Sequence, residues 1–187
     1  MCRDDGEDFL SKFGEITVPI IAMQSIESSE NRLGRVTKLF VDATFIRELG
    51  VKLTQVSKGA CEAKLDVQAW MKHKGSVHTC VLASLADHTA MGAALSFVDA
   101  KTPLKTAEFK MNSLCPAIGD SLCSRAKVTF AGSSVLNITS EVFSVQDSRE
   151  TLVATATVAI AIETDSFLTR KAFSAMNAVC AIAPALA

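Results

Sequence analysis

Asp87 is the residue whose position most strongly suggests chemistry, because it lies in the middle of a long apolar segment. From Thr79 to Val98 the sequence contains small or apolar residues and only a few polar ones. About 20 residues at ~1.5 Å each form a helix of roughly 30 Å, and a helix that is apolar nearly all round belongs inside a protein. A carboxylate buried there needs a partner, so we expect Asp87 to be either structurally paired or catalytic.

The elements around this helix are predicted from hydrophobic periodicity. Apolar residues recur at helical spacing over Arg35–Leu49, and Gly50 is a plausible stop for that helix. Ser25–Gly34, just before it, is polar and is predicted to be a linker. Six strands are expected, at 51–56, 60–70, 104–114, 122–130, 135–145 and 152–162.

The strands alternate between apolar and polar residues, which assigns each side chain to one face. In the strand after the long helix, Thr106 falls opposite Phe109 and Met111, and in the next strand Phe130 shares the apolar face with Leu122. Short turns between the last four strands favour an antiparallel meander. One sheet face must cover the apolar helix, so the predicted fold class is α+β.

This arrangement resembles the hotdog fold, in which an antiparallel β-sheet wraps around one long central α-helix. Gly75-x-Val77-His78, followed by Leu82 and Asp87, resembles the G-x-V-H-G-G-x-x-x-x-L-x-D pattern of acyl-CoA thioesterases of the phenylacetyl-CoA thioesterase type. Supporting similarities are Leu49-Gly50-Val51, Pro116-Ala117 with Gly119-Asp120, and the strand Ala154–Thr157. We therefore expect an N-terminal extension (1–35), a hotdog thioesterase domain (36–163) and a C-terminal tail (164–187).

The resemblance implies an activity and a set of site residues. Asp87 would be the family's acid, contributed by the facing subunit of a dimer, and would act as nucleophile or general base. The backbone N–H of Thr79 would stabilise the oxyanion, because N–H groups at a helix N-terminus favour negative charge. His78 would shape the loop, Thr106 would help to orient water, and Gly75 would lie against the substrate.

The motif departs from the family at two places that face the expected substrate. Thr79-Cys80 replaces Gly-Gly, and Lys72 stands where the family usually has Asn. Lys72 could pair with Asp87 or with a CoA phosphate, and Cys80 adds a Cβ near the thioester. These differences motivate a second hypothesis, a non-catalytic hotdog protein that binds acyl-CoA or another ligand. A hydratase is a distant third, because its Asp and His spacing is not found.

Each candidate residue also has a purely structural interpretation. Asp87 could be paired only for stability, His78 could be a loop histidine bonded to backbone, and Thr106 could be an ordinary sheet residue. His88 is expected to be structural or interfacial, since it points about 100° away from Asp87 on the helix. Four basic strand residues could meet CoA phosphates or simply be solvated: Lys105, Lys110, Arg125 and Lys127.

Composition limits the remaining possibilities. The 187 residues are 49% hydrophobic and 21% charged, with a net charge of −1, which predicts a globular chain and disfavours nucleic-acid binding. Six dispersed cysteines and three histidines do not form a zinc motif, so no metal site is predicted. We expect no signal peptide and no membrane span, hence a cytoplasmic protein, with an organellar matrix as the open alternative. The expected partners are acyl-CoA, whose CoA is part of the substrate and not a cofactor, and further copies of the chain as a homodimer or dimer of dimers.

Overall fold

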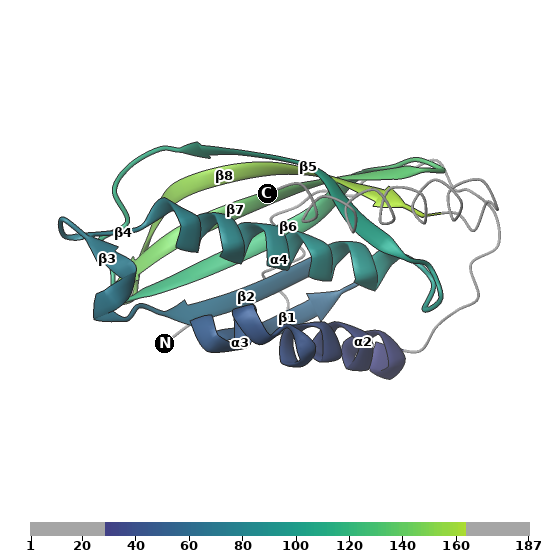
Figure 1. Ribbon diagram of the computed structural model, residues 1–187, viewed down its shortest axis with the longest axis horizontal. Helices are drawn as coiled ribbons and strands as arrows, with labels where there is room; N and C mark the ends of the chain where they lie inside the picture. Colours follow the sequence, from purple (N-terminus) through teal and green to yellow (C-terminus); the bar gives the residue numbers. More distant parts are fainter. Residues whose placement is uncertain (1–28, 164–187) are drawn as a thin grey trace, which may run out of the picture.

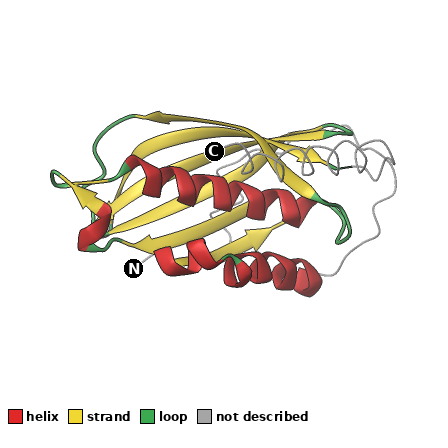
Figure 2. Cartoon of the chain, viewed as in Figure 1, coloured by secondary structure: helices red, strands yellow, loops and turns green. Residues whose placement is uncertain are grey.

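The computed structural model describes residues 29–163, and these residues form a six-stranded sheet, a small two-stranded sheet and three α-helices (Figure 1, Figure 2). The predicted tail (164–187) and most of the predicted N-terminal extension lie outside the described residues, so both domain boundaries stay predictions.

The predicted central helix is confirmed as α4 (Thr79–Phe97), which lies across the sheet (Figure 1). Its apolar side chains are buried on nearly all sides, because the sheet curves around it and a second helix packs against it. Gly92 makes this close packing feasible, since a Cβ at that position would come within 2.7 Å of Cys61 Sγ and 3.3 Å of Phe40. A helix that is apolar all round therefore serves here as the core of the fold.

The sheet has six strands in the order β1-β2-β6-β7-β8-β5, and all neighbours are antiparallel. The hotdog fold predicted from the sequence is confirmed, because one face of this sheet wraps around α4 (Figure 2). The strand bounds are β1 Val51–Ser57, β2 Ala60–Asp66, β5 Leu104–Ser113, β6 Ser121–Ala131, β7 Val135–Gln146 and β8 Arg149–Ile162.

The predicted meander is correct only for β6, β7 and β8. β5 does not lie beside β6 but pairs with β8 at the far edge of the sheet. The loop from Leu114 to Asp120 makes this possible, because it crosses the end of the sheet to join the two strands. Gly119 lies so close to the backbone of Val145 that a Cβ there would overlap it, and its N–H donates to Ser144 Oγ at 2.8 Å. The loop is therefore fixed against β7.

The helix predicted over Arg35–Leu49 is two helices, α2 (Ser29–Asp42) and α3 (Thr44–Leu49). The linker interpretation is wrong for residues 29–34, which belong to α2. The break at Ala43, an extended residue, changes the helical phase. Val36 and Phe40 are buried from α2, and an unbroken helix would next turn Arg47 inward, whereas the break buries Ile46 instead. Gly50 ends α3 in the left-handed region, as predicted.

The second predicted strand is shorter than its alternation suggests. β2 ends at Asp66, and the chain then forms a short 3₁₀ helix, η1 (Ala69–Met71), which leaves Trp70 66% exposed. Next comes a small hairpin of β3 (Lys72–His73) and β4 (Ser76–Val77), directly before α4 (Figure 1).

Two β-bulges reverse the predicted faces of side chains. In β5 the register shifts between Thr106 and Glu108, so Ala107 is the additional residue and points outward. Thr106 consequently lies on the inner face with Phe109, where strict alternation placed it on the opposite face. In β6 a shift between Val128 and Phe130 turns the Phe130 ring to solvent, so its predicted place in the core is wrong.

Candidate active site

The first turn of α4 has one unused backbone donor. His78 is the N-cap, and its Nδ1 accepts a hydrogen bond from the N–H of Cys80 at 3.2 Å. The N–H of Val81 donates to the carbonyl oxygen of His78 at 2.9 Å. Within residues 29–163 the N–H of Thr79 has no hydrogen-bond acceptor, and the residue is exposed. The helix start therefore presents the Thr79 N–H, with the positive end of the helix dipole, to a ligand.

A cavity of about 270 Å³ opens beside this donor. It lies between the β3–β4 hairpin, the first turn of α4 and the loop that follows β5. Its wall is partly apolar and partly hydroxyl- or thiol-bearing, and consists of Ser76, Val77, Thr79, Leu82, Ser113, Leu114, Cys115, Pro116 and Ala117.

The hairpin is tied to the other wall of the cavity by hydrogen bonds. The N–H of Val77 donates to the carbonyl oxygen of Ala117 at 2.8 Å, and Ser76 Oγ donates to the same oxygen at 3.3 Å. The turn at its tip, Lys74-Gly75, has positive φ at both residues, 50° and 81°. Gly75, predicted near the substrate, thus allows the tight turn that brings the hairpin back to α4.

Asp87 lies two turns further along α4 and is half-buried. Its Oδ1 accepts a hydrogen bond from Thr106 Oγ1 at 3.1 Å. This contact depends on the β5 bulge, because the bulge is what turns Thr106 toward the helix. Burial raises the pKa of Asp87 above its usual range, and the Thr106 hydroxyl opposes that shift. The raised pKa makes the carboxylate a stronger base.

The two groups of predicted site residues are not brought together within one chain. Thr79 and Asp87 are eight residues apart on one helix, which corresponds to a separation of about 12 Å along its axis. His78, Thr79, Cys80, Gly75 and Lys72 gather at the start of α4. Asp87 and Thr106 form a separate pair in its middle, and no ion pair joins Lys72 to Asp87 among the described residues.

His88, the neighbour of Asp87, has the structural position that the sequence predicted. Its ring meets Phe40 of α2 edge-on, with the ring centroids 4.6 Å apart. Burial lowers the pKa of His88 to about 4, so the imidazole is neutral at physiological pH. His88 therefore joins α2 to α4 as an uncharged ring.

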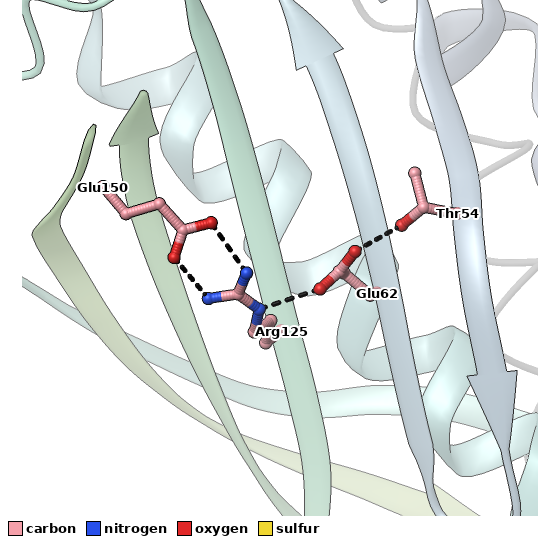
Figure 3. A network of polar contacts seen from close by, with 4 residues as sticks. All are labelled: Thr54, Glu62, Arg125 and Glu150. Atoms are coloured by element: carbon pink, nitrogen blue, oxygen red, sulfur yellow. Dashed lines mark hydrogen bonds and ion pairs between the residues drawn. The ribbon is translucent and has the colours of Figure 1, made fainter. Parts of the chain in front are cut away.

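Arg125, one of the residues suggested for CoA phosphates, is already occupied. Figure 3 shows its guanidinium between two carboxylates on the face of the sheet away from α4. It donates to both oxygens of Glu150, at 2.8 and 2.7 Å, and through Nε to Glu62 at 2.8 Å. Glu62 also accepts from Thr54 at 2.8 Å, and the Phe143 ring lies 4.8 Å from the guanidinium. Arg125 thus stabilises the sheet, and its guanidinium is already engaged by two carboxylates.

Sequence reasoning missed part of the cavity wall. Ser113, Leu114 and Cys115 belong to it, yet they come from the end of an edge strand and carry no motif of their own. The similarity of Pro116-Ala117 to the family was the only signal for this loop, and it did not indicate a wall facing Thr79.

Two further features concern metal binding and membrane insertion. Within residues 29–163, no three His, Cys, Asp or Glu side chains gather as metal ligands would. α4 is long and apolar enough to cross a membrane by composition, but 56% of that segment is buried in the fold. The same composition suits the core helix of a globular domain, which is the position α4 occupies.

Comparison with known proteins confirms the resemblance to thioesterases. Residues 74–151 match the family described as the thioesterase superfamily. No curated protein matches the chain. A solved thioesterase family protein from Silicibacter pomeroyi has a TM-score of 0.68 at 24% identity, covering 71% of this chain and 99% of its own. The PaaI protein of the phenylacetic acid degradation operon of E. coli has a TM-score of 0.65 at 20% identity, covering 74% and 97%. A thioesterase from Haemophilus influenzae gives 0.63 at 15% identity, covering 75% and 93%.

Proposed function

We propose that this hotdog-fold chain, whose residues 74–151 match the thioesterase superfamily, hydrolyses acyl-CoA thioesters at sites formed between two copies of the chain. The observation that carries the proposal is the pair of complementary half-sites on α4. One is the unpaired Thr79 N–H beside a cavity, and the other is the Asp87 carboxylate held by Thr106.

The distance between these half-sites argues for two chains. In thioester hydrolysis the carbonyl carbon is attacked while the negative charge develops on the oxygen bonded to it. An oxyanion donor and a base must therefore lie within a few ångströms of each other, whereas Thr79 and Asp87 are separated by about 12 Å along α4. A second copy can supply the missing group.

The edge strand β5 offers the means to bring the second copy into place. It hydrogen-bonds to β8 on one side, and within residues 29–163 no strand pairs with its other side. If two copies paired antiparallel about a point between Phe109 and Lys110, Ser113 of one would lie opposite Thr106 of the other. Ser113 lines the cavity at Thr79, and Thr106 holds Asp87, so this pairing would join the two half-sites.

The chemistry can then proceed by either route that the sequence left open. As a general base, Asp87 takes a proton from water while the oxygen of that water attacks the carbonyl carbon. As a nucleophile, Asp87 forms an anhydride that water then cleaves. In both routes the Thr79 N–H stabilises the oxyanion, the carbon–sulfur bond breaks, and the thiolate takes a proton to leave as CoA. The net products are a carboxylic acid and CoA.

A second candidate function is acyl-CoA binding without hydrolysis. The exposed side chains of Thr79 and Cys80 occupy the helix start where the family has Gly-Gly, and Lys72 replaces the family's Asn. These side chains would narrow the approach of the thioester, which favours binding over turnover.

The test is subunit mixing, with hydrolysis of a panel of acyl-CoA thioesters as the assay. Asp87→Asn removes the base, and Thr79→Pro removes the oxyanion N–H. Each variant alone should be nearly inactive. Mixed dimers would contain one intact site of two, so a random mixture should recover about a quarter of wild-type activity. No recovery would refute the shared site, and CoA binding by a wild type that hydrolyses no thioester would establish the binding alternative.

A further inference from the structure

The end of the molecule that carries the cavity also carries an exposed aromatic ring and two unpaired lysines. Trp70 is 66% exposed on η1. Lys72 and Lys74 follow it on the β3–β4 hairpin, and within residues 29–163 neither forms an ion pair. We propose that Trp70, Lys72 and Lys74 bind the nucleotide end of coenzyme A, with the adenine stacked on the indole and the phosphates held by the two lysines. The inference rests on the proposed function, because it assigns a binding site to the nucleotide end of the proposed acyl-CoA substrate.

The backbone places this group beside the candidate active site. The carbonyl oxygen of Met71, next to Trp70, accepts a hydrogen bond from the N–H of His78 at 2.8 Å. His78 directly precedes Thr79, and the other strand of the hairpin, Ser76–Val77, lines the cavity. The β3–β4 hairpin lies directly before the start of α4 (Figure 1), so a substrate whose carbonyl meets the Thr79 N–H lies next to the segment that carries Trp70, Lys72 and Lys74.

The charge at this end favours an anion. From Ala69 to Cys80 the sequence contains two lysines and two histidines but no acidic residue, and the loop from Leu114 to Asp120 contains one, at its last position. The positive end of the α4 dipole adds to the same field. An anionic ligand with an aromatic group would therefore find both of the interactions it needs in one place.

The conformation of Lys74 supports a role for its charge. Its φ of 50° lies in the left-handed region, which favours Gly, Asn or Asp over a long side chain. The turn therefore holds a lysine at its tip at some cost in backbone strain, and the residue is exposed.

The lysines also favour a small anionic ligand over a second copy of the chain. Trp70, Leu114 and Ile118 are all exposed at this end, at 66%, 54% and 60%. Such a patch could be a subunit contact, but the centres of protein interfaces are depleted in lysine. Base stacking on an aromatic ring flanked by cations is, in contrast, a standard mode of nucleotide binding.

The experiment uses the fact that Trp70 is the only tryptophan in a chain without tyrosine. Its intrinsic fluorescence reports on this position alone. Titration with CoA or adenosine diphosphate should quench the signal, and pantetheine, which lacks the nucleotide, should not. The quenching should weaken with added salt, because the lysine contacts are electrostatic.

Kinetics with paired substrates separate this inference from the proposed function. The same acyl group is presented on CoA and on pantetheine. Trp70→Ala and the double variant Lys72→Gln/Lys74→Gln should each lower kcat/KM for the CoA ester about tenfold. Trp70→Ala should leave kcat/KM for the pantetheine ester unchanged, and the lysine variant should lose more on the CoA ester than on the pantetheine ester. Trp70→Phe should restore most of the loss because the aromatic face remains.

The matched controls lie elsewhere on the surface. Phe45→Ala removes an equally exposed ring from α3, and Lys101→Gln removes an exposed lysine beyond the other end of α4. Both should behave as wild type with either ester.

Equal losses on both esters, or quenching by pantetheine, would overturn the proposal. A fall in the dimer fraction of Trp70→Ala with unchanged CoA quenching in Lys72→Gln/Lys74→Gln would also overturn it and indicate a subunit contact. If neither ester is hydrolysed but CoA still quenches Trp70, the binding site stands and the proposed hydrolysis fails.

Discussion

Thr79→Pro tests the oxyanion donor without disturbing the fold. Thr79 is the first residue of α4, and proline is favoured at that position because its N–H is not used within the helix. The preceding residue, His78, has φ −62° and ψ 136°, which is the extended conformation that a following proline requires. Since the Thr79 N–H has no acceptor within residues 29–163, no hydrogen bond of the described fold is lost. The change in unfolding free energy should therefore stay within about 0.5 kcal/mol.

The catalytic effect should be large in comparison. Removing one preorganised oxyanion donor costs about a hundredfold to a thousandfold in kcat, or about 3–4 kcal/mol of transition-state stabilisation. KM should change little, because the negative charge exists only in the transition state. The assay is steady-state hydrolysis of an acyl-CoA that the wild type turns over, together with thermal unfolding and circular dichroism to verify the fold.

Thr79→Ala is the matched control for this variant. It removes the same side chain but keeps the backbone N–H, so it should retain most of the wild-type kcat. If the alanine and proline variants are both folded and differ by less than tenfold in kcat, the Thr79 N–H is not the oxyanion donor. The reasoning from the helix start would then be refuted.

Three further predictions concern the middle of α4. Thr106→Val should move the acid limb of the pH–rate profile to higher pH, because the hydroxyl that lowers the pKa of Asp87 is lost; an unchanged limb would show that Asp87 is not the titrating group. Asp87→Asn should raise the thermal stability at neutral pH, since ionising a carboxyl whose pKa is raised by burial opposes folding. That gain should fade as pH falls through the raised pKa of Asp87 and be absent below about 4, where the carboxyl is protonated in both folded and unfolded chains; a constant gain would contradict the assignment. Gly92→Ala should lower the unfolding free energy by about 1 kcal/mol, as contact with Cys61 Sγ outweighs the gain in helix propensity. In a Cys61→Ala background the same substitution should be neutral or stabilising, and equal losses in both backgrounds would show that this contact is not the cause.

The core of the fold was predictable because its signals are local. α4 begins and ends within one residue of its predicted bounds, since a long segment of mostly small and apolar residues is stable only inside the fold. Cys61, Ala63 and Leu65 are buried as their alternation predicted, because a strand has a period of two wherever it is regular. The motif from Gly75 to Asp87 was also recognisable, because its residues lie within one short stretch of the sequence.

The errors occur where the chain departs from regular periodicity. Thr106 and Phe130 each lie next to a bulge, and one additional residue reverses the face of every side chain beyond it. The break at Ala43 likewise changes which side chains of the helical segment before β1 are buried. Each irregularity is set by contacts with distant segments, so the local pattern does not reveal it.

The sequence by itself determined the central helix, the strands and the two half-sites, because all of them depend on residues close together in the chain. Only the tertiary structure decided what surrounds Thr79 and Asp87. It places β5 at the open edge of the sheet, turns Thr106 toward Asp87 and makes residues 113–117 a wall of the cavity that Thr79 also lines. It also engages Arg125 with Glu62 and Glu150 in an ion-pair network on the sheet. These outcomes depend on contacts between segments far apart in the sequence, and such contacts form only when the sheet closes around α4.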